Sequence, residues 1–318
     1  MKLHPILKWV GGKTQLLPEI VSKIPADTDI YVEPFLGGGA VFLDVLVSRP
    51  NIKLFIVNDA NKQLMSLYGN VFSIFYPRLV KELKAIEKAF NEAEDKKEFY
   101  YNERKKYNDY MINFNTVDNT KDKVINRIKQ NARLMFLNKT CFNGLYRVNG
   151  KGEFNAAFNN STSVSFDYEN LDNLHSIAET KTIYMSTDDY KNICCCDAIK
   201  RHLNTYPEEY KKVFVYLDPP YKPIKESGKC VSYTSANFDD VDQTELKEMC
   251  DEIHKNGYMF LQSNSEPETN FFGKLYADYN ITTVKARRNI NSDGAGRGKI
   301  NEILISNFNN NYGNVSLF

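Results

Sequence analysis

One segment near the start of the chain constrains the fold more than any other. A β-favouring run at 30–33 precedes three consecutive glycines at 37–39, and an apolar stretch at 40–47 then suits a buried helix. A second strand is expected at 53–57, and it ends in an acid, Asp59. Glycines after a strand let the backbone approach a ligand closely, because no Cβ intervenes. The segment therefore predicts the first half of a doubly wound, nucleotide-binding α/β unit.

The ligand of this unit is not determined by the glycines alone. Asp59 lies 22 residues after Gly37, where an acid can bind a ribose diol. A dinucleotide would suit the same pattern, although Phe42 replaces the third glycine of that motif. A tight turn without a ligand also explains the glycines, and a helix cap explains Asp59. A P-loop around Lys13 is excluded, because its first glycine would fall on Leu7.

The remaining pattern predicts one α/β domain with an insertion. Residues 62–112 favour helices broken at Pro77, residues 121–137 favour a basic amphipathic helix, and Asn149-Gly150 indicates a β-hairpin. We expect the α/β domain to comprise residues 1–66 and 182–318, and the mainly helical insertion to comprise residues 67–181. Further strands are expected at 182–185, 213–217, 258–262 and 302–305.

Composition excludes several classes of protein. The chain has 318 residues, 42% of them hydrophobic, so it is not disordered as a whole. It has no apolar run of 18 residues and no apolar leader, so we expect no membrane partner and a cytoplasmic location. The six cysteines match no zinc spacing, so we expect free thiols and no metal.

Net charge is only +1, but basic residues cluster. Residues 121–151 hold eight Lys or Arg against one acid, and residues 285–299 hold five against one. Lys222, Lys225 and Lys229 form a third group. Any one cluster could be ordinary solvated surface. Together they favour a nucleic-acid partner, which needs a basic patch and not a basic average.

The motif Asp218-Pro219-Pro220-Tyr221 carries the most specific chemistry. It follows a strongly apolar strand, so it lies at a carboxyl end, where open α/β sheets bind ligands. The prolines supply carbonyl acceptors without N–H donors, and the aspartate is a further acceptor. Tyr221 offers a flat ring. This set suits the amino group of an aromatic base, although a proline-rich turn is the plainer explanation.

These motifs, in this order, resemble the Dam-type, D12-class DNA adenine-N6 methyltransferases in their α-arrangement. The resemblance runs from about residue 4 to residue 306. It rests on Lys8-Trp9-Val10-Gly11-Gly12-Lys13, Glu33-Pro34-Phe35-Leu36-Gly37-Gly38-Gly39, Asn58-Asp59, Phe142-Asn143-Gly144-Leu145-Tyr146-Arg147-Val148-Asn149, Gly152-Glu153-Phe154-Asn155 and Asp218-Pro219-Pro220-Tyr221.

The resemblance implies a Rossmann-like methyltransferase sheet and S-adenosyl-L-methionine as cofactor. Asp218, Pro219, Pro220 and Tyr221 would be catalytic, with the acceptors binding the amine of a flipped adenine and Tyr221 stacking on its ring. The cofactor would be held by Trp9, Lys13, Glu33, Phe35, Gly37, Gly39, Asp59, Asp189, Tyr190 and Asp218.

The resemblance further implies double-stranded DNA as the partner. The expected DNA contacts, including two arginines of the second basic cluster, are Lys139, Phe142, Asn143, Leu145, Tyr146, Arg147, Asn149, Arg287 and Arg288. The hairpin is similar to those that recognise GATC. The family's usual Val-Pro after the hairpin is Ala156-Ala157 here, however, so the same chemistry at a different short motif is the alternative.

Other classes of protein fit less of the chain. An oxidoreductase would explain the glycines but not the acceptor motif or the basic middle. A non-enzymatic DNA-binding protein should have lost Asp218 or the glycine loop, and both are present. A methyltransferase for RNA or protein glutamine often has Asn in place of that Asp. We expect a monomer in a bacterial or phage-infected cell, in a restriction–modification, phage or regulatory system, without a stable complex with any endonuclease.

Overall fold

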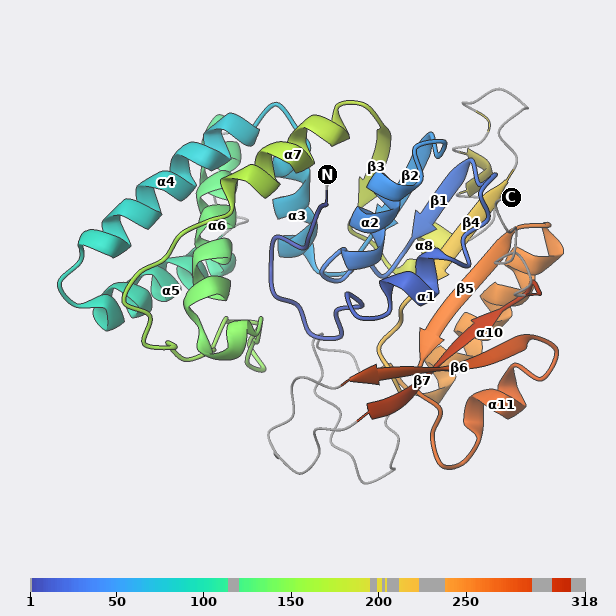
Figure 1. The fold of residues 1–318 in the computed structure, drawn as a ribbon. Helices are drawn as coiled ribbons and strands as arrows, with labels where there is room; N and C mark the ends of the chain where they lie inside the picture. Colours follow the sequence, from blue (N-terminus) through green and yellow to red (C-terminus); the bar gives the residue numbers. More distant parts are fainter. Residues whose placement is uncertain are drawn as a thin grey trace.

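The computed structural model describes residues 2–113, 120–194, 199–201, 204, 212–222, 238–287 and 299–309. Within these ranges the chain forms one seven-stranded sheet with helices on both faces and a group of helices beside it (Figure 1). This is the α/β architecture expected from the sequence. No helix in the described ranges has both the length and the apolar character needed to cross a membrane.

The sheet has the strand order β3-β2-β1-β4-β5-β7-β6, and β7 alone runs in the direction opposite to the other six strands. Such an order is that of a Rossmann-like methyltransferase sheet. The sequence predicted six of the seven strands and missed β6, an edge strand. The strands are β1 (Ile30–Glu33), β2 (Leu54–Asn58), β3 (Thr182–Ser186), β4 (Val213–Leu217), β5 (Met259–Asn264), β6 (Asn280–Arg287) and β7 (Lys299–Ser306).

The strand order reverses direction between β1 and β4. Ile30 on β1 pairs in parallel with Leu54 on β2 and with Val213 on β4. The carboxyl ends of these three strands are therefore neighbours at one edge of the sheet. Ligands of open α/β sheets bind in the crevice at such a switch point. The glycine loop, Asp59 and Asp218 all follow strands that end there.

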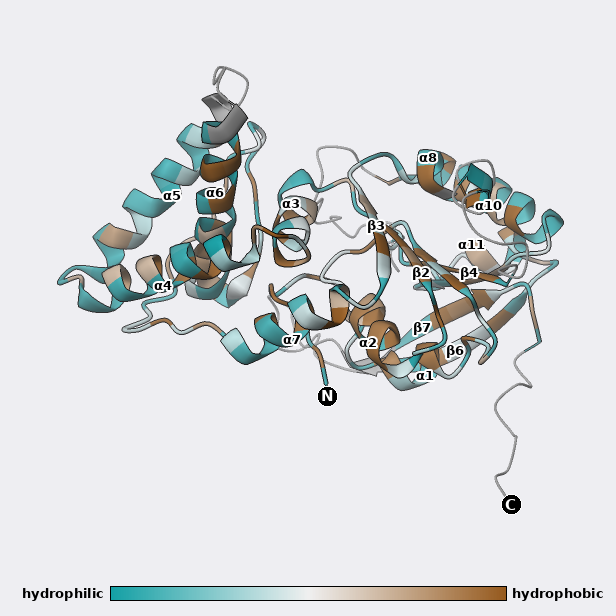
Figure 2. Cartoon of the chain, turned by 90° about the horizontal axis from the view of Figure 1, so that it is seen from above, coloured by the Kyte–Doolittle hydropathy of each residue, from teal (hydrophilic) through white to brown (hydrophobic). Residues whose placement is uncertain are grey.

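Alternating side chains of the central strands build two hydrophobic cores. Tyr31, Phe55 and Phe214 face one core, whereas Val32 and Val215 face the other. All five side chains are buried, as the strands of a sheet covered on both faces require. Figure 2 shows the two helix layers: α1 (Leu17–Val21) and α2 (Ala40–Ser48) on one side, and α8 (Tyr190–Cys194), α10 (Asp240–Lys255) and α11 (Phe271–Leu275) on the other.

The central part of the chain is helical. Pro77 lies in the first turn of α4, where its missing N–H costs no hydrogen bond. Aromatic residues, including Phe90, Phe99 and Phe136, pack these helices together. Their core is continuous with the first core of the sheet. The helices are α3 (Lys62–Val71), α4 (Tyr76–Glu92), α5 (Lys96–Asn113), α6 (Thr120–Thr140) and α7 (Tyr168–Ala178).

A short β-hairpin follows α6, as Asn149-Gly150 predicted. Val148 bridges to Phe154 in the antiparallel sense, and Cys141 bridges to Phe158. Gly152 N–H donates to the Asn149 carbonyl over 2.9 Å and takes a φ of 78°, which favours glycine. We call residues 141–158 the recognition turn.

Candidate active site

A cleft opens where β1 and β4 end. Its walls come from the segment before α1, from the end of β1 and the loop after it, from the start of α2 and from the residue after β4. Four of the residues expected to bind the cofactor, Trp9, Lys13, Glu33 and Gly37, line it together with Asp218. The complete lining is Trp9, Val10, Gly11, Gly12, Lys13, Glu33, Leu36, Gly37, Gly38, Ala40, Val41 and Asp218.

Lys13 and Asp218 form an ion pair at the floor of this cleft. Lys13 Nζ lies 2.9 Å from Asp218 Oδ2, and the two side chains are 7% and 19% exposed. Lys13 Nζ also donates to the Gly11 carbonyl over 2.7 Å and lies 4.6 Å from the centre of the Tyr221 ring. The ammonium thus joins the glycine-containing N-terminal segment to both ends of the Asp218–Tyr221 motif.

The second carboxylate oxygen of Asp218 has no protein partner. Asp218 Oδ1 is buried and accepts no hydrogen bond from any described residue. Burial raises the pKa of Asp218 to about 6, against the opposing effect of Lys13. A buried acceptor without a donor is costly, because it has lost its hydration. Such an acceptor is suited to a donor that arrives with a ligand, for example an amino group.

Tyr221 and Pro220 are held by hydrogen bonds with residues of β7 and α10. The Tyr221 hydroxyl donates to Glu302 Oε2 on β7 over 2.7 Å. Gln243 Nε2 on α10 donates to the Pro220 carbonyl over 3.1 Å. Pro219 is buried, whereas Pro220 is exposed. Glu302 and Gln243 were not predicted from the sequence, because neither belongs to a motif and each lies far from the tetrapeptide in the chain.

The glycine loop is held by Asp59. Gly37 N–H donates to Asp59 Oδ2 over 2.8 Å, and Asn61 N–H donates to Asp59 Oδ1 over the same distance. Burial raises the pKa of Asp59, which these two bonds partly oppose. Asn58, which the sequence motif included without a role, holds the adjacent strand ends, because its amide donates to the carbonyls of Pro34 and Asp188.

Gly39 has a structural reason to lack a side chain. It precedes α2 with a φ of 76°, and a Cβ there would lie 2.8 Å from the Tyr68 hydroxyl. That hydroxyl donates to the Gly38 carbonyl over 2.7 Å. Gly39 is absent from the cleft wall itself, although Gly38 and Ala40 on either side of it line the cleft. It therefore shapes the loop that borders the cleft.

Glu33 is buried in the cleft wall. The Tyr31 hydroxyl donates to its Oε2 over 2.6 Å, and its pKa is raised well above the usual range by burial. The Phe42 N–H is a further donor to this carboxyl. Glu33 thus ties the end of β1 to the first turn of α2.

Three aromatic rings gather beside the end of β1. The Phe35 ring centre lies 4.9 Å from that of Tyr190 and 6.1 Å from that of Phe238. Asp189 is exposed, and its Oδ1 accepts the Lys191 N–H over 2.9 Å. The structure therefore brings Phe35 and Tyr190 together, but neither lines the cleft, and their contact with a cofactor stays a prediction. No group of three or more His, Cys, Asp or Glu in the described ranges is arranged to bind a metal.

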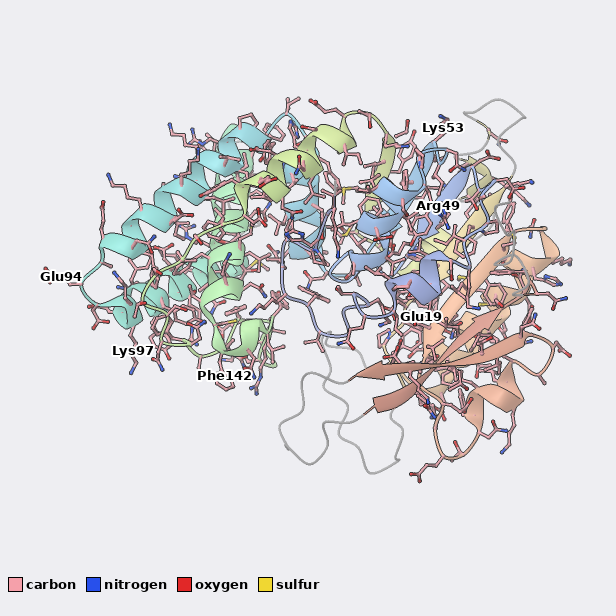
Figure 3. The ribbon with its side chains drawn as sticks, viewed as in Figure 1. Glu19, Arg49, Lys53, Glu94, Lys97 and Phe142 are labelled. Atoms are coloured by element: carbon pink, nitrogen blue, oxygen red, sulfur yellow. The ribbon has the colours of Figure 1, made fainter. Side chains whose placement is uncertain are left out.

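The recognition turn presents some of the expected DNA contacts to solvent. Phe142 is 61% exposed, and Figure 3 shows it at the outer end of the turn below α6. Asn143 is exposed in a left-handed conformation with a φ of 60°, and Arg147 and Lys139 are also exposed. Leu145 is half-buried. These side chains could reach a duplex without any unfolding of the turn.

Two other expected DNA contacts are engaged within the protein. Asn149 Oδ1 accepts the N–H groups of Lys151 and Glu153, and its amide donates to Glu153 Oε2 over 2.7 Å. Tyr146 is only 8% exposed. Its ring stacks on Trp9 with a centroid distance of 5.2 Å. Their contacts with DNA stay predictions.

Some residues of the basic clusters form ion pairs within the protein. In the first, Arg133 Nε lies 2.9 Å from Glu103 Oε2, so this arginine is neutralised within the helical region. In the third, the ammonium of Lys222 pairs with Asp240. Arg288, Lys225 and Lys229 lie outside the described residues, as does the side chain of Arg287. Exposed Arg127, Lys139 and Arg147 remain as basic groups along α6 and the recognition turn.

Comparison with known proteins agrees with this geometry. Residues 9–290 match the model of the D12 class N6 adenine-specific DNA methyltransferase family. The type II methyltransferase M.MjaIII of Methanocaldococcus jannaschii is 37% identical over 319 residues, which cover 97% of this chain and 100% of that protein. The type II methyltransferase M1.LlaDCHI of Lactococcus lactis is 30% identical over 98% of this chain and 97% of its own length.

A third relative is named a DNA adenine methylase and not a type II methyltransferase. The DNA adenine methylase of Haemophilus influenzae is 26% identical over 96% of this chain and 93% of its own length. The family match and the identity to M.MjaIII both span nearly the whole chain. The chain therefore belongs to the D12 class of N6 adenine-specific DNA methyltransferases and is an adenine-specific DNA methyltransferase.

Proposed function

We propose that this enzyme transfers a methyl group from S-adenosyl-L-methionine to the N6 amine of an adenine flipped out of duplex DNA. Residues 1–66 and 182–318 would form the catalytic domain, and residues 67–181 would recognise the target. One observation carries the proposal: Asp218 Oδ1 is a buried acceptor without a donor at the edge of the cleft. An exocyclic amine supplies the missing donor.

The residues around the cleft fit the cofactor. Trp9 and Gly37 provide an apolar wall and a backbone without a Cβ. Asp59 would accept a ribose hydroxyl beside the two backbone N–H groups that it already binds, and Phe35 with Tyr190 would offer flat rings for an adenine. When bound, S-adenosyl-L-methionine would supply a methyl group activated by a sulfonium. Lys13, Glu33, Gly39 and Asp189 complete the proposed cofactor-binding set.

Asp218 and its neighbours would prepare the amine. The N6 lone pair of adenine is conjugated with the ring, so the amine is a poor nucleophile. Asp218 Oδ1 and the Pro219 carbonyl would accept its two hydrogens and draw the nitrogen towards tetrahedral geometry. Preorganised acceptors also stabilise the positive charge that develops on that nitrogen. Tyr221, held by Glu302, would stack on the base and orient it.

The duplex would be held by the recognition turn. Arg147 would contact a base, Phe142 and Leu145 would enter the stack where the adenine leaves it, and Asn143 and Lys139 would contact neighbouring groups. Tyr146, Asn149, Arg287 and Arg288 are further proposed contributors. Extruding a base costs a few kcal/mol, which contacts of this kind must offset.

We further propose GATC as the target, with the same chemistry at another short motif as the second candidate. Ala157 is the observation that favours the second candidate. It stands where the resembling family has proline, and it is exposed while its carbonyl accepts the Phe142 N–H over 2.7 Å. A cytoplasmic monomer acting in a restriction–modification, phage or regulatory system, without a stable endonuclease complex, completes the proposal.

Methylation of a plasmid tests the target. Unmethylated plasmid is treated with the enzyme and S-adenosyl-L-methionine, and modified bases are mapped by single-molecule sequencing. N6-methyladenine confined to GATC is the expected result. N6-methyladenine at another motif would keep the chemistry and replace the target sequence. The absence of methylation would contradict the proposed cofactor or substrate.

A further inference from the structure

Trp9 lies between the cofactor cleft and the recognition turn. On one side its ring stacks on Tyr146, with ring centres 5.2 Å apart and planes inclined by 21°. On the other side it packs against the glycine loop: a Cβ at Gly37 would lie 3.4 Å from Trp9 Cδ1, and one at Gly38 would lie 3.0 Å from Trp9 Cβ. A shift of Tyr146 would therefore move a wall of the cleft.

The Tyr146 hydroxyl lies near the side chains of Asn61 and Tyr107. Burial raises the pKa of Tyr146, and these two side chains partly oppose that rise. The Asn61 N–H in turn donates to Asp59 Oδ1 over 2.8 Å, and Asp59 holds Gly37. The ring of Tyr146 therefore contacts the glycine loop through Trp9, and its hydroxyl lies near a residue that neighbours Asp59.

The backbone around this stack is fixed by a single buried amide. Asn138 is 2% exposed, and its Oδ1 accepts the Lys8 N–H over 2.8 Å. Its Nδ2 donates to the Lys8 carbonyl over 3.0 Å and to the Gly144 carbonyl over 2.9 Å. The segment that carries Trp9 and the start of the recognition turn are therefore joined to the same residue at the end of α6.

We propose that Tyr146 is a positioning residue that couples the recognition turn to the cofactor cleft. The inference rests on the proposed function. Tyr146 immediately precedes Arg147 and lies four residues after Phe142, so DNA that engages these exposed side chains changes the position of Tyr146. The stack transmits this change to Trp9 and the glycine loop. DNA then tightens cofactor binding, and by linkage the cofactor tightens DNA binding by the same factor.

Two substitutions distinguish the effect of the Tyr146 ring from that of its hydroxyl. Tyr146→Phe keeps the ring and removes the hydroxyl, whereas Tyr146→Leu keeps apolar volume and removes the stack. The matched control is Phe99→Leu, which makes the same kind of change at a ring that packs on Phe90 and Phe136, away from the cleft. Thermal unfolding of each variant shows whether it has folded.

The coupling is measured by calorimetry. The dissociation constant of S-adenosylhomocysteine is determined with and without a duplex that contains the sequence methylated by wild type. We expect the duplex to lower it about fivefold or more in wild type and Phe99→Leu, as for typical coupled sites. The ratio of the dissociation constants without and with the duplex should be largely retained in Tyr146→Phe, and it should fall to about one in Tyr146→Leu. A ratio as large as that of wild type in a folded Tyr146→Leu would overturn the proposal. Equal dissociation constants with and without the duplex in wild type would also overturn it.

A second measurement needs no variant. Trp9 is the only tryptophan of the chain, so the emission of the protein reports on the stack. Addition of the duplex without cofactor should change that emission, and unchanged emission at saturating duplex would overturn the coupling. Failure of the proposed function is distinguishable, because wild type would then transfer no methyl group to DNA. Methyl transfer with an unresponsive Trp9 would reject the coupling alone.

Discussion

Lys13 Nζ lies 2.9 Å from Asp218 Oδ2 and 4.6 Å from the centre of the Tyr221 ring. One ammonium therefore contacts both the first and the last residue of the acceptor motif. It occupies one carboxylate oxygen and leaves the other for a ligand. It also favours the charged form of a carboxylate that burial would neutralise.

This relationship predicts a pH dependence. Only ionised Asp218 has both oxygens free of protons, and burial raises its pKa to about 6. The rate of single-turnover methyl transfer at saturating cofactor and DNA should therefore rise as pH increases through about 6 and then level off. Lys13→Gln removes the cation that lowers this pKa. In the pH–rate profile of this variant, the increase in rate should therefore occur at higher pH than in wild type.

Lys13→Arg is the matched variant, because it keeps a cation near Asp218. Its rising limb should stay close to that of wild type, although the different shape of the guanidinium can lower the rate. If the rate of methyl transfer rises at the same pH in wild type and Lys13→Gln, Lys13 does not set the pKa of Asp218.

Glu302 should matter through Tyr221. The carboxylate on β7 accepts the Tyr221 hydroxyl over 2.7 Å and makes no part of the cleft wall. A hydrogen bond to a charged group contributes roughly 1.5–3 kcal/mol, so loss of the correct ring position should lower the rate of methyl transfer about tenfold or more. Glu302→Ala should leave the affinity for DNA nearly unchanged, as measured by fluorescence anisotropy.

A double-mutant cycle tests whether the two residues act together. Tyr221→Phe removes the same hydrogen bond from the other side. If Glu302 acts only by holding Tyr221, the double variant should be no slower than the slower single variant. Additive losses would give Glu302 a separate role.

The sequence predicted the part of the site that is local in the chain. Gly37 and Asp59 belong to one β–loop–α–β unit, so both could be placed at the same edge of the sheet from the sequence. Asp59 was predicted as a ribose ligand, and its 2.8 Å hydrogen bond with the Gly37 N–H was not predicted. Asp218 could be placed at the same edge, because an apolar strand precedes it. The glycine loop and Asp218 both line the cleft, and their roles there stay predictions.

The remaining parts depend on long-range pairing. Glu302 reaches Tyr221 only because β7 inserts antiparallel between β5 and β6. β6 itself was missed, because it is an edge strand with no continuous apolar run. Tyr146 was expected to face DNA, yet the packing of residue 9 against residue 146 buries its ring. No local pattern contains that contact.

Gly39 should be intolerant of a side chain. Gly39→Ala would place an L-residue at a φ of 76° with its Cβ 2.8 Å from the Tyr68 hydroxyl. The backbone cost alone is roughly 1–2 kcal/mol, and displacement of Tyr68 adds to it. We expect a lower free energy of unfolding in urea and weaker binding of S-adenosylhomocysteine.

Gly69→Ala is the control for this change. Gly69 lies inside α3, and a Cβ there has no heavy atom within 4 Å. Alanine is the better helix former by about 1 kcal/mol, so this variant should be at least as stable as wild type. Equal stability of Gly39→Ala and wild type would contradict the described loop.

Arg147 should determine one base of the target. If its guanidinium binds a base through two hydrogen bonds, Arg147→Ala should reduce discrimination at that position by about 1–3 kcal/mol. The measurement is kcat/KM on duplexes that differ at single positions. Lys139→Ala, at another exposed cation, should weaken binding to all of these duplexes alike and reduce its salt dependence.

Unchanged base preference in Arg147→Ala would remove Arg147 from the recognition set. A uniform loss across all duplexes would instead make it a phosphate contact, like the one expected for Lys139.

The central claim is that Asp218 accepts the adenine amine during methyl transfer. Its most direct test is mass spectrometry of nucleosides released from plasmid DNA after incubation with S-adenosyl-L-methionine and either wild type or Asp218→Ala. Wild type should produce N6-methyldeoxyadenosine, and Asp218→Ala should still bind DNA but produce none above background. Equal yields from the two proteins, or a methylated cytosine from wild type, would contradict the account.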